Sequence, residues 1–397
     1  MNLRSRLSPA LRNAPKPKLE IRRIGPSVAL SPSNPVHTND RAKKYAVGIV
    51  AAVKRKLAAR KSDPADVSLL SHDEILSDVT EWIPTGMPFM DDVFGGGWPV
   101  GRMVELFGDE GAGKSALSHL AILQSQREGG VPILLDFEMA LDKKKMNTLG
   151  IDPSCLVYAS PRTMEDGLDL IESVLTDMEK SPPPSPVLIV WDSIALAVPS
   201  AELEESSNKD PHVGLQARIM GKGMRKLVRR VAKLRVCVIF INQQRDTIGK
   251  AGPRGGFQEP TTPGGKATKF TCSLRLRCQR VKTIKSGDRP VAYLIKTSTK
   301  KCRLAPPHQS VVWWLDFTVG PSIELSILQR LKDAKVAKPT GGGSYGVPWC
   351  RSFKSEKWIE LMQDKEFADK ARAASRTSVP QFGTFAAMVD GSTDGAD

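Results

Sequence analysis

The chain lacks the features that mark several common protein classes. Its 397 residues include six cysteines, none of which forms a C-x-x-C pair or has zinc-ligand spacing. This scatter argues against a structural zinc site and favours a reducing compartment. No run of eighteen apolar residues occurs, so we expect no transmembrane helix and no membrane partner.

Acidic residues are fewer than basic residues. The chain has 43 Asp and Glu against 58 Lys and Arg, a formal net charge of +15 and a pI of about 9.6. That balance favours a polyanionic partner, with nucleic acid ahead of an anionic membrane. Residues 1–40 are rich in Arg, Ser and Pro, and the prolines favour a disordered basic arm over an organellar transit peptide. We expect a cytoplasmic, nucleoid-associated protein, with an organelle as the alternative if residues 1–40 are a transit peptide.

One stretch predicts phosphate binding. Residues 103–107 have the pattern of a buried strand, Gly108-x-x-x-x-Gly113-Lys114-Ser115 follows, and residues 116–126 have helical periodicity. Glycines let backbone N–H groups turn inward, and the helix N-terminus adds partial positive charge. We expect Lys114 to reach the β- and γ-phosphates and Ser115 to ligate Mg²⁺. A chance glycine-rich turn is the alternative, but the flanking strand and helix argue against it.

The rest of the chain alternates strands with helices. Strands are expected at 131–136, 187–190 and 236–241, and helices at 163–178 and 211–233. This alternation predicts a parallel sheet covered on both faces. After residue 271 it gives way to consecutive strands, which we expect to be antiparallel at one edge, and then to a helix at 322–334. Residues 42–60 form an amphipathic pattern, and from the residues alone this helix could dock on a neighbouring subunit or on its own core.

Polar residues follow several of these strands. In parallel sheets ligands bind at the carboxyl ends of the strands. Asp192 at such an end is expected to hold Mg²⁺ beside Ser115. Glu138 or Asp136 could deprotonate the attacking water, and the residues alone leave both open. Gln243 follows another strand and could sense the γ-phosphate.

Two flexible segments and a basic helix predict nucleic-acid binding. Residues 245–269 are rich in glycine, proline and basic residues, a second polar segment spans 202–211, and Arg218, Lys222, Arg225 and Arg229 share one helical face. A solvated charged face is the alternative. Few aromatics lie in these segments, so we expect contacts mostly to phosphates. The predicted DNA contacts are Arg218, Arg225, Lys226, Arg245, Lys250, Arg254, Gly264, Gly265 and Lys266.

The chain carries several motifs in an order that is typical of one protein family. They are Ile83-Pro-Thr-Gly86, Gly101-Arg-Met-Val-Glu-Leu-Phe-Gly108 with the phosphate loop, Asp136-Phe-Glu-Met-Ala-Leu-Asp142, His212-Val-Gly-Leu-Gln-Ala-Arg218, Met224-Arg-Lys-Leu227, Phe240-Ile-Asn-Gln-Gln-Arg245, Thr261-Thr-Pro-Gly-Gly265 and Lys301-Cys-Arg-Leu-Ala-Pro-Pro307. Between about residues 79 and 327 the chain therefore resembles the RecA family of ATP-dependent DNA-strand-exchange recombinases.

The resemblance implies roles for individual residues. It implies Glu138 as the general base, Gln243 as the γ-phosphate sensor, and Lys301 and Arg303 on the face that covers the neighbouring protomer's nucleotide. It implies DNA-binding loops at about 202–214 and 245–266, and a helix at 42–60 that docks on the next protomer. The implied ATP contacts are Gly108, Asp109, Glu110, Gly111, Ala112, Gly113, Lys114, Ser115 and Asp142.

The chain also departs from the family pattern. The family usually has an aromatic residue three positions after the match to Asp142, where it stacks on adenine, and this chain has Lys145. The C-terminal region resembles the family's small terminal domain only weakly. We expect a disordered arm at 1–40, an oligomerisation helix and linker at 41–78, a RecA-like ATPase core at 79–327, a small domain at 328–374 and a disordered tail at 375–397.

The expected fold is α/β: a mostly parallel central sheet with antiparallel edge strands, an N-terminal docking helix and a small C-terminal region. The expected protein uses ATP and Mg²⁺, forms a helical filament on single-stranded DNA, and exchanges strands with a homologous duplex. A hexameric helicase and an accessory DNA-binding ATPase are the alternatives.

Overall fold

The fold is described from a computed structural model, in which residues 40–59, 79–204, 214–244 and 262–377 are described. The chain divides into two units, Met1–Asp73 and Glu74–Asp397, and each is treated by itself. In the first unit, helix α2 (Asp40–Ala59) agrees with the helix expected at 42–60. Its Ile49 and Val53 side chains lie one helical turn apart and are 50% and 36% exposed, so an apolar stripe lies open on this helix.

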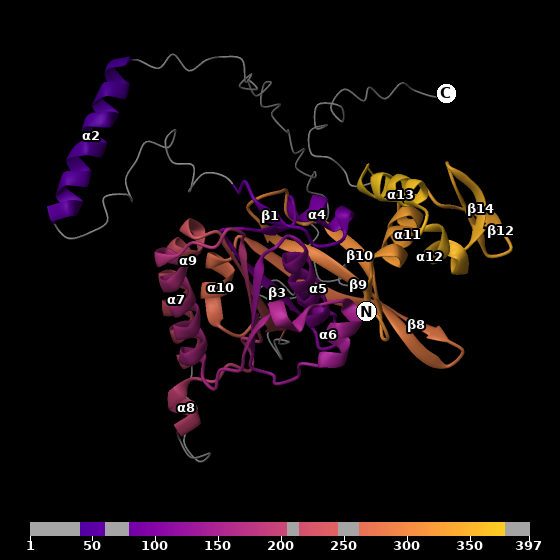
Figure 1. The fold of residues 1–397 in the computed structure, drawn as a ribbon, viewed down its shortest axis with the longest axis horizontal. Helices are drawn as coiled ribbons and strands as arrows, with labels where there is room; N and C mark the ends of the chain where they lie inside the picture. The colour runs from indigo at the N-terminus through magenta and orange to yellow at the C-terminus, as the bar shows by residue number, and fades with distance from the viewer. Residues whose placement is uncertain (1–39, 60–78, 205–213, 245–261, 378–397) are drawn as a thin grey trace, which may run out of the picture. The chain divides into compact units, whose positions relative to one another are not determined.

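A nine-stranded sheet organises the second unit (Figure 1). Its order is β11-β10-β9-β8-β3-β7-β6-β4-β5. The strands from β8 to β5 in this order pair in parallel, and β8 to β11 pair antiparallel at the other side. The bounds are β3 (Met103–Gly108), β4 (Val131–Asp136), β5 (Val157–Ala159), β6 (Val187–Asp192), β7 (Val236–Gln243), β8 (Leu274–Ser286), β9 (Arg289–Cys302), β10 (Ser310–Asp316) and β11 (Gly320–Ser322). The predicted mostly parallel sheet with antiparallel edge strands is confirmed.

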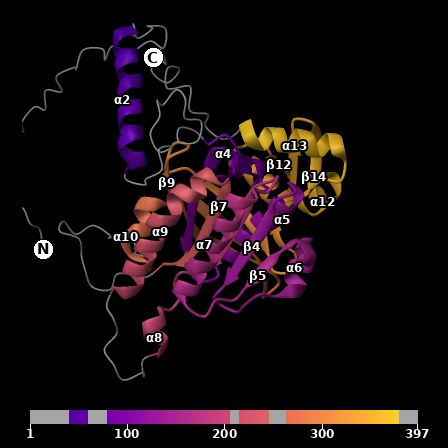
Figure 2. The same ribbon diagram turned by 60° about the vertical axis from the view of Figure 1, so that its left-hand side comes forward.

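Helices cover both faces of this sheet, as the alternating pattern predicted. One core cluster gathers α4 (Pro88–Phe94), α5 (Lys114–Arg127) and α11 (Ile323–Asp333), and the other gathers α7 (Met164–Lys180) and α9 (Leu215–Lys233). Figure 2 shows α7 and α9 side by side. The strands between them are buried on both faces, so their continuous apolar runs follow from the layering.

Local sequence signals explain where these elements begin. Thr163 caps α7 in a reciprocal pair with Asp166: the Asp166 amide donates to Thr163 Oγ1 at 3.1 Å, and the Thr163 amide donates to Asp166 Oδ2 at 3.0 Å. The shorter elements are α6 (Lys143–Leu149), α8 (Ser200–Glu204), α10 (Gly265–Thr271), the 3-10 turn η4 (Pro153–Cys155), and the paired strands β1 (Trp82–Ile83) and β2 (Trp98–Pro99).

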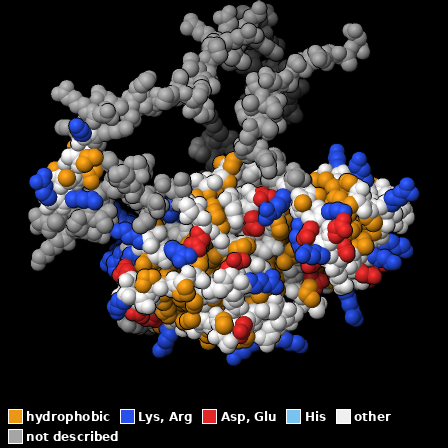
Figure 3. Space-filling view, turned by 45° about the horizontal axis from the view of Figure 1, so that its top comes forward, with side chains coloured by type: hydrophobic (Ala, Val, Ile, Leu, Met, Phe, Trp, Pro, Cys, Tyr) orange, Lys and Arg blue, Asp and Glu red, His pale blue; other side chains and the backbone are white. Residues whose placement is uncertain are grey.

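The C-terminal part of the second unit contains a small antiparallel sheet that the sequence did not predict. Strands β12 (Lys338–Gly341), β13 (Ser344–Val347) and β14 (Cys350–Lys354) form it, followed by η5 (Ser355–Lys357), α12 (Trp358–Leu361) and α13 (Lys365–Thr377). Gly342 and Gly343 have φ angles of 57° and 73° and build the two-residue turn between β12 and β13. On the face in Figure 3, Lys and Arg side chains project around this part and alternate with Asp and Glu.

Within the described ranges, no helix is both long and apolar enough to cross a membrane.

Candidate nucleotide site and DNA-binding surface

The phosphate loop lies between β3 and α5, as predicted. Gly108, Gly111 and Gly113 have φ angles of 153°, 65° and 78°, which side chains rarely adopt. A Cβ at Gly108 would lie 2.0 Å from the Cys278 carbonyl oxygen, and one at Gly113 would lie 2.9 Å from the Trp313 ring. Residues of β8 and β10 therefore pack directly against the loop backbone, and only glycine fits at positions 108 and 113.

Lys114 is the first residue of α5, and its ammonium group lies back over the loop. Its Nζ donates to the carbonyl oxygens of Gly108 at 3.1 Å and Asp109 at 2.6 Å. Burial lowers the pKa of Lys114, while nearby acidic groups, among them Asp192 and Glu138, oppose that shift. The ammonium group thus lies among acceptors that phosphate oxygens could replace.

Ser115 and Asp192 meet at the carboxyl end of β6. Ser115 Oγ donates to Asp192 Oδ2 at 2.8 Å, and Asp192 Oδ1 is buried with no protein partner. Burial raises the pKa of Asp192 to about 7, and the charges of Glu138 and Asp136 add to that rise. A hydroxyl and a carboxylate with a free oxygen suit Mg²⁺, which takes few protein ligands and keeps water and phosphate oxygens as the others. The residues present therefore fit this ion, although the described residues contain no group of three or more metal-binding side chains.

Glu138 and Asp136 occupy different positions. Glu138 lines the pocket, and its Oε1 accepts a hydrogen bond from Ser193 Oγ at 2.8 Å. Asp136 is buried behind it, where Oδ1 accepts from the Glu138 amide at 3.1 Å and Oδ2 accepts from Tyr158 Oη at 3.3 Å. Asp136 does not line the pocket. Sequence reasoning missed Ser193 and Tyr158, although Ser193 directly follows Asp192.

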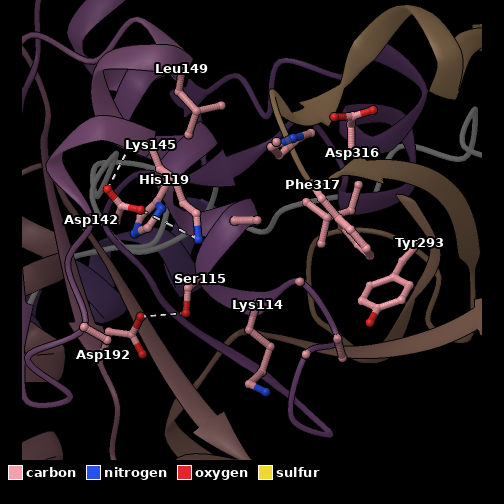
Figure 4. Close-up of a pocket in the computed structure, with 18 of the residues that line it drawn as sticks. Lys114, Ser115, His119, Asp142, Lys145, Leu149, Asp192, Tyr293, Asp316 and Phe317 are labelled. Atoms are coloured by element: carbon pink, nitrogen blue, oxygen red, sulfur yellow. Dashed lines mark hydrogen bonds and ion pairs between the residues drawn. The ribbon is translucent and has the colours of Figure 1, made fainter. Parts of the chain in front are cut away.

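A pocket of about 480 Å³ extends from the phosphate loop. Gln243, at the end of β7, lines it together with Glu138 and Asp192, so the polar residues predicted at three strand ends lie around one cavity. Figure 4 shows Lys114 and Ser115 between two walls, with Asp142, Lys145 and His119 on one side and Tyr293 and Phe317 on the other. The volume is within the range of small-ligand sites.

The two walls differ in chemistry. Lys145 Nζ lies 3.9 Å from Asp142 Oδ2, and burial lowers the pKa of His119 to about 4, which leaves that imidazole neutral at pH 7. The Tyr293 and Phe317 rings meet edge to face, 4.6 Å apart. The sequence did not predict this pair, because the meeting of the two rings depends on the register of β9 and β10, which pairs Tyr293 with Leu315.

Lys301 and Arg303 lie away from this pocket. Lys301 Nζ donates to the carbonyl oxygens of Lys269 at 2.8 Å and Phe270 at 3.0 Å, and Arg303 Nη2 donates to that of Phe270 at 3.3 Å. Both cations therefore cap the C-terminal end of α10, where the helix dipole is negative. Burial lowers the pKa of Lys301, and the charge of Arg303 adds to this effect. Neither residue lines the pocket.

Some of the predicted DNA contacts lie on α9 and α10. Arg218 and Arg225 are exposed on α9. Lys226 is exposed too, but its Nζ lies 3.3 Å from Glu172 Oε1, so part of its charge is already matched. A Cβ at Gly265 would lie 2.7 Å from the Ala217 Cβ, which lets α10 begin tight against α9. Gly264 and Lys266 flank this contact, and Arg245, Lys250 and Arg254 lie outside the described residues.

The fold and the site define a class: an α/β protein with a phosphate-binding loop and strand-end carboxylates around one pocket. Comparison with known proteins identifies the family. The family model of the RecA N-terminal domain matches residues 60–322. The chain belongs to the RecA family.

Individual relatives agree with this assignment. Protein RecA of Bifidobacterium breve is 36% identical over 263 residues, which cover 66% of this chain and 64% of that protein. Protein RecA of Tropheryma whipplei is 36% identical over 291 residues, 72% of this chain and 64% of that protein. Protein RecA of Xylella fastidiosa is 34% identical over 311 residues, 78% of this chain and 87% of that protein. The match therefore spans slightly less than two thirds of the first two relatives.

Proposed function

We propose that this chain is a DNA-dependent ATPase that assembles into a helical filament on single-stranded DNA, pairs it with a homologous duplex and exchanges strands. The observation that carries the proposal is one pocket lined by the phosphate loop, Glu138, Asp192 and Gln243. A basic surface on α9 and membership of the RecA family support the DNA-directed part.

In this proposal the phosphate loop and Lys114 bind the triphosphate of ATP. Ser115 and Asp192 hold the Mg²⁺ ion, which neutralises charge on the phosphates. Glu138 accepts a proton from the attacking water, and the Ser193 hydroxyl fixes one of its oxygens so that the other is free. Gln243 contacts the γ-phosphate and responds to its loss.

Lys301 and Arg303 act on the neighbouring protomer's nucleotide. Their distance from their own pocket supports this role, since both side chains lie at the end of α10 instead. A cation supplied across an interface stabilises charge on the γ-phosphate as it transfers, as an arginine finger does. Hydrolysis then depends on assembly.

Assembly and DNA binding use other parts of the chain. The open apolar stripe of α2 docks on an adjacent protomer, within an N-terminal segment spanning 41–78. Arg218, Arg225 and Lys226, with Gly264 to Lys266, contact phosphates of the DNA. The core is proposed to span 79–327 and the small C-terminal domain 328–374.

Electron microscopy tests the assembly directly. The full chain is mixed with circular single-stranded DNA, Mg²⁺ and a slowly hydrolysed ATP analogue. Continuous helical filaments along the DNA are the expected result. Closed rings, or bare DNA at protein concentrations that saturate binding, would contradict the proposal.

A further inference from the structure

A buried polar cluster lies beneath the nucleotide pocket, and none of its members lines that pocket. It consists of Glu105 on β3, Asn242 on β7 and Arg275 on β8. Glu105 and Asn242 are completely buried, and Arg275 is 9% exposed. Side chains of this kind are rare in a sheet interior unless they are fully paired.

Both polar atoms of the Asn242 side chain form hydrogen bonds. Its Nδ2 donates to Glu105 Oε1 at 3.0 Å and to the Pro263 carbonyl oxygen at 2.9 Å. Its Oδ1 accepts from the Gln243 amide at 3.0 Å. The opposite amide orientation would turn Oδ1 toward a carboxylate and a carbonyl oxygen, so the network fixes the orientation that is present.

Arg275 is paired with Glu105 and packs on an aromatic ring. Its Nε donates to Glu105 Oε2 in a short contact, and its guanidinium lies over the Phe107 ring at 4.8 Å. Glu105 and Arg275 are also register partners on adjacent parallel strands. Removal of either partner would leave an uncompensated buried charge. The ion pair with Arg275 therefore holds the Glu105 carboxylate in place within the sheet.

Asn242 consequently joins three separate parts of the molecule. One bond reaches Gln243, which lines the nucleotide pocket, and another reaches Pro263, which directly precedes Gly264 and the N-terminus of α10. The third reaches the anchored Glu105. If the Gln243 backbone shifts when a γ-phosphate is bound, Asn242 cannot follow without also moving Pro263 or losing that bond.

We infer that Asn242 is a positioning residue that couples the nucleotide pocket to the DNA-binding start of α10. The inference rests on the proposed function, because it requires that Gly264 to Lys266 meet DNA and that Gln243 meets nucleotide. It adds the route between them: a γ-phosphate at Gln243 favours one position of Pro263, and DNA at α10 favours the same position.

Coupling between two sites is reciprocal, which makes this route measurable. The coupling factor is the affinity for a fluorescent oligothymidylate with a non-hydrolysable ATP analogue, divided by that with ADP. It is determined by fluorescence anisotropy with the full chain. In the wild type it should lie between about 5-fold and 150-fold. The oligonucleotide should in turn change the affinity for the ATP analogue relative to that for ADP by the same factor.

Asn242→Ala is expected to bring this factor to within about twofold of unity while the protein still binds each ligand. Ser326→Ala is the matched control. Ser326 is also completely buried and also bridges two elements, since it donates to Ser322 and accepts from the Trp314 amide. Its loss should lower stability in a similar way and leave the coupling factor at the wild-type value.

A measurement on the unaltered protein covers the case in which Asn242→Ala does not fold. Hydrogen exchange of the α10 amides, without DNA, should slow when the ATP analogue replaces ADP. An Asn242→Ala protein with the wild-type factor, or α10 amides that exchange equally with both nucleotides, overturns the inference. A wild-type coupling factor of one would count against the proposed function and would also overturn the inference, because no coupling would remain for Asn242 to carry.

Discussion

Asp91 offers a test of the turn that leads into the core. Its Oδ1 accepts the Thr85 amide at 2.8 Å and so closes the segment Ile83-Pro-Thr-Gly86 over the start of α4. Burial, the largest cause, raises the pKa of Asp91 from 3.8 to about 6. Because the folded protein prefers the protonated acid, ionisation of Asp91 opposes folding.

The sign and size of the effect follow from linkage. Between pH 3.8 and about 6 the folded state holds a proton that the unfolded state releases, so this residue's contribution to stability falls as pH rises and is constant above pH 6. The rise from 3.8 to about 6, at about 1.36 kcal/mol per pH unit, corresponds to about 3 kcal/mol. Asn at this position keeps the acceptor without the charge. Asp91→Asn should therefore gain stability relative to wild type by up to about 3 kcal/mol between pH 4 and pH 8.

Urea unfolding of both proteins at several pH values measures this difference. The control is Asp152→Asn, an exposed carboxyl whose pKa is lowered by hydrogen bonds from Ser154, so its effect should have the opposite sign. A difference between Asp91→Asn and wild type that does not change with pH would refute the reasoning.

Three further predictions concern the proposed activity. Lys301→Ala combined with Arg303→Ala should bind ATP without hydrolysing it, and mixing it with Lys114→Ala protein should restore some turnover; normal hydrolysis by the double variant alone would exclude the trans role. Affinity for single-stranded DNA should fall with salt at a log–log slope of about −0.7 per phosphate contacted, and Arg218→Ala should flatten that slope; an unchanged slope means that Arg218 does not meet phosphate. Lys145→Tyr adds an aromatic ring to the wall formed by Asp142, Lys145 and His119. It should tighten ATP binding in calorimetry by about 2- to 10-fold without changing the affinity for inorganic triphosphate. Equal changes for both ligands would mean that residue 145 does not contact the adenine base.

Much of the fold followed from local patterns in the sequence. Periodicity located β3, β4, β6 and β7, since strands buried on both faces have continuous apolar runs that sequence displays directly. The small sheet of β12 to β14 escaped prediction. Its strands are four or five residues long and bury only Val347 and Phe353, so they show no clear alternation of apolar and polar residues.

The candidate site was also predicted only in part. Phosphate-loop residues and strand-end carboxylates are visible in sequence because each lies at a fixed offset from its own strand. Ser193 with Glu138, Tyr293 with Phe317, and Asn242 with Glu105 depend on register between elements distant in the chain. Sequence periodicity carries no information about those pairings, because register is set by the packed sheet.

Strand exchange between a circular single strand and a homologous linear duplex tests the central claim most directly. With ATP and Mg²⁺, the wild-type chain should convert these substrates to nicked circular duplex and a displaced linear strand. Lys114→Ala should form no product. Glu138→Gln should bind ATP and DNA but hydrolyse ATP about 10²- to 10⁴-fold more slowly, because water activation is lost. Wild-type protein that hydrolyses ATP on DNA and yields no joint molecules with homologous partners would contradict the account.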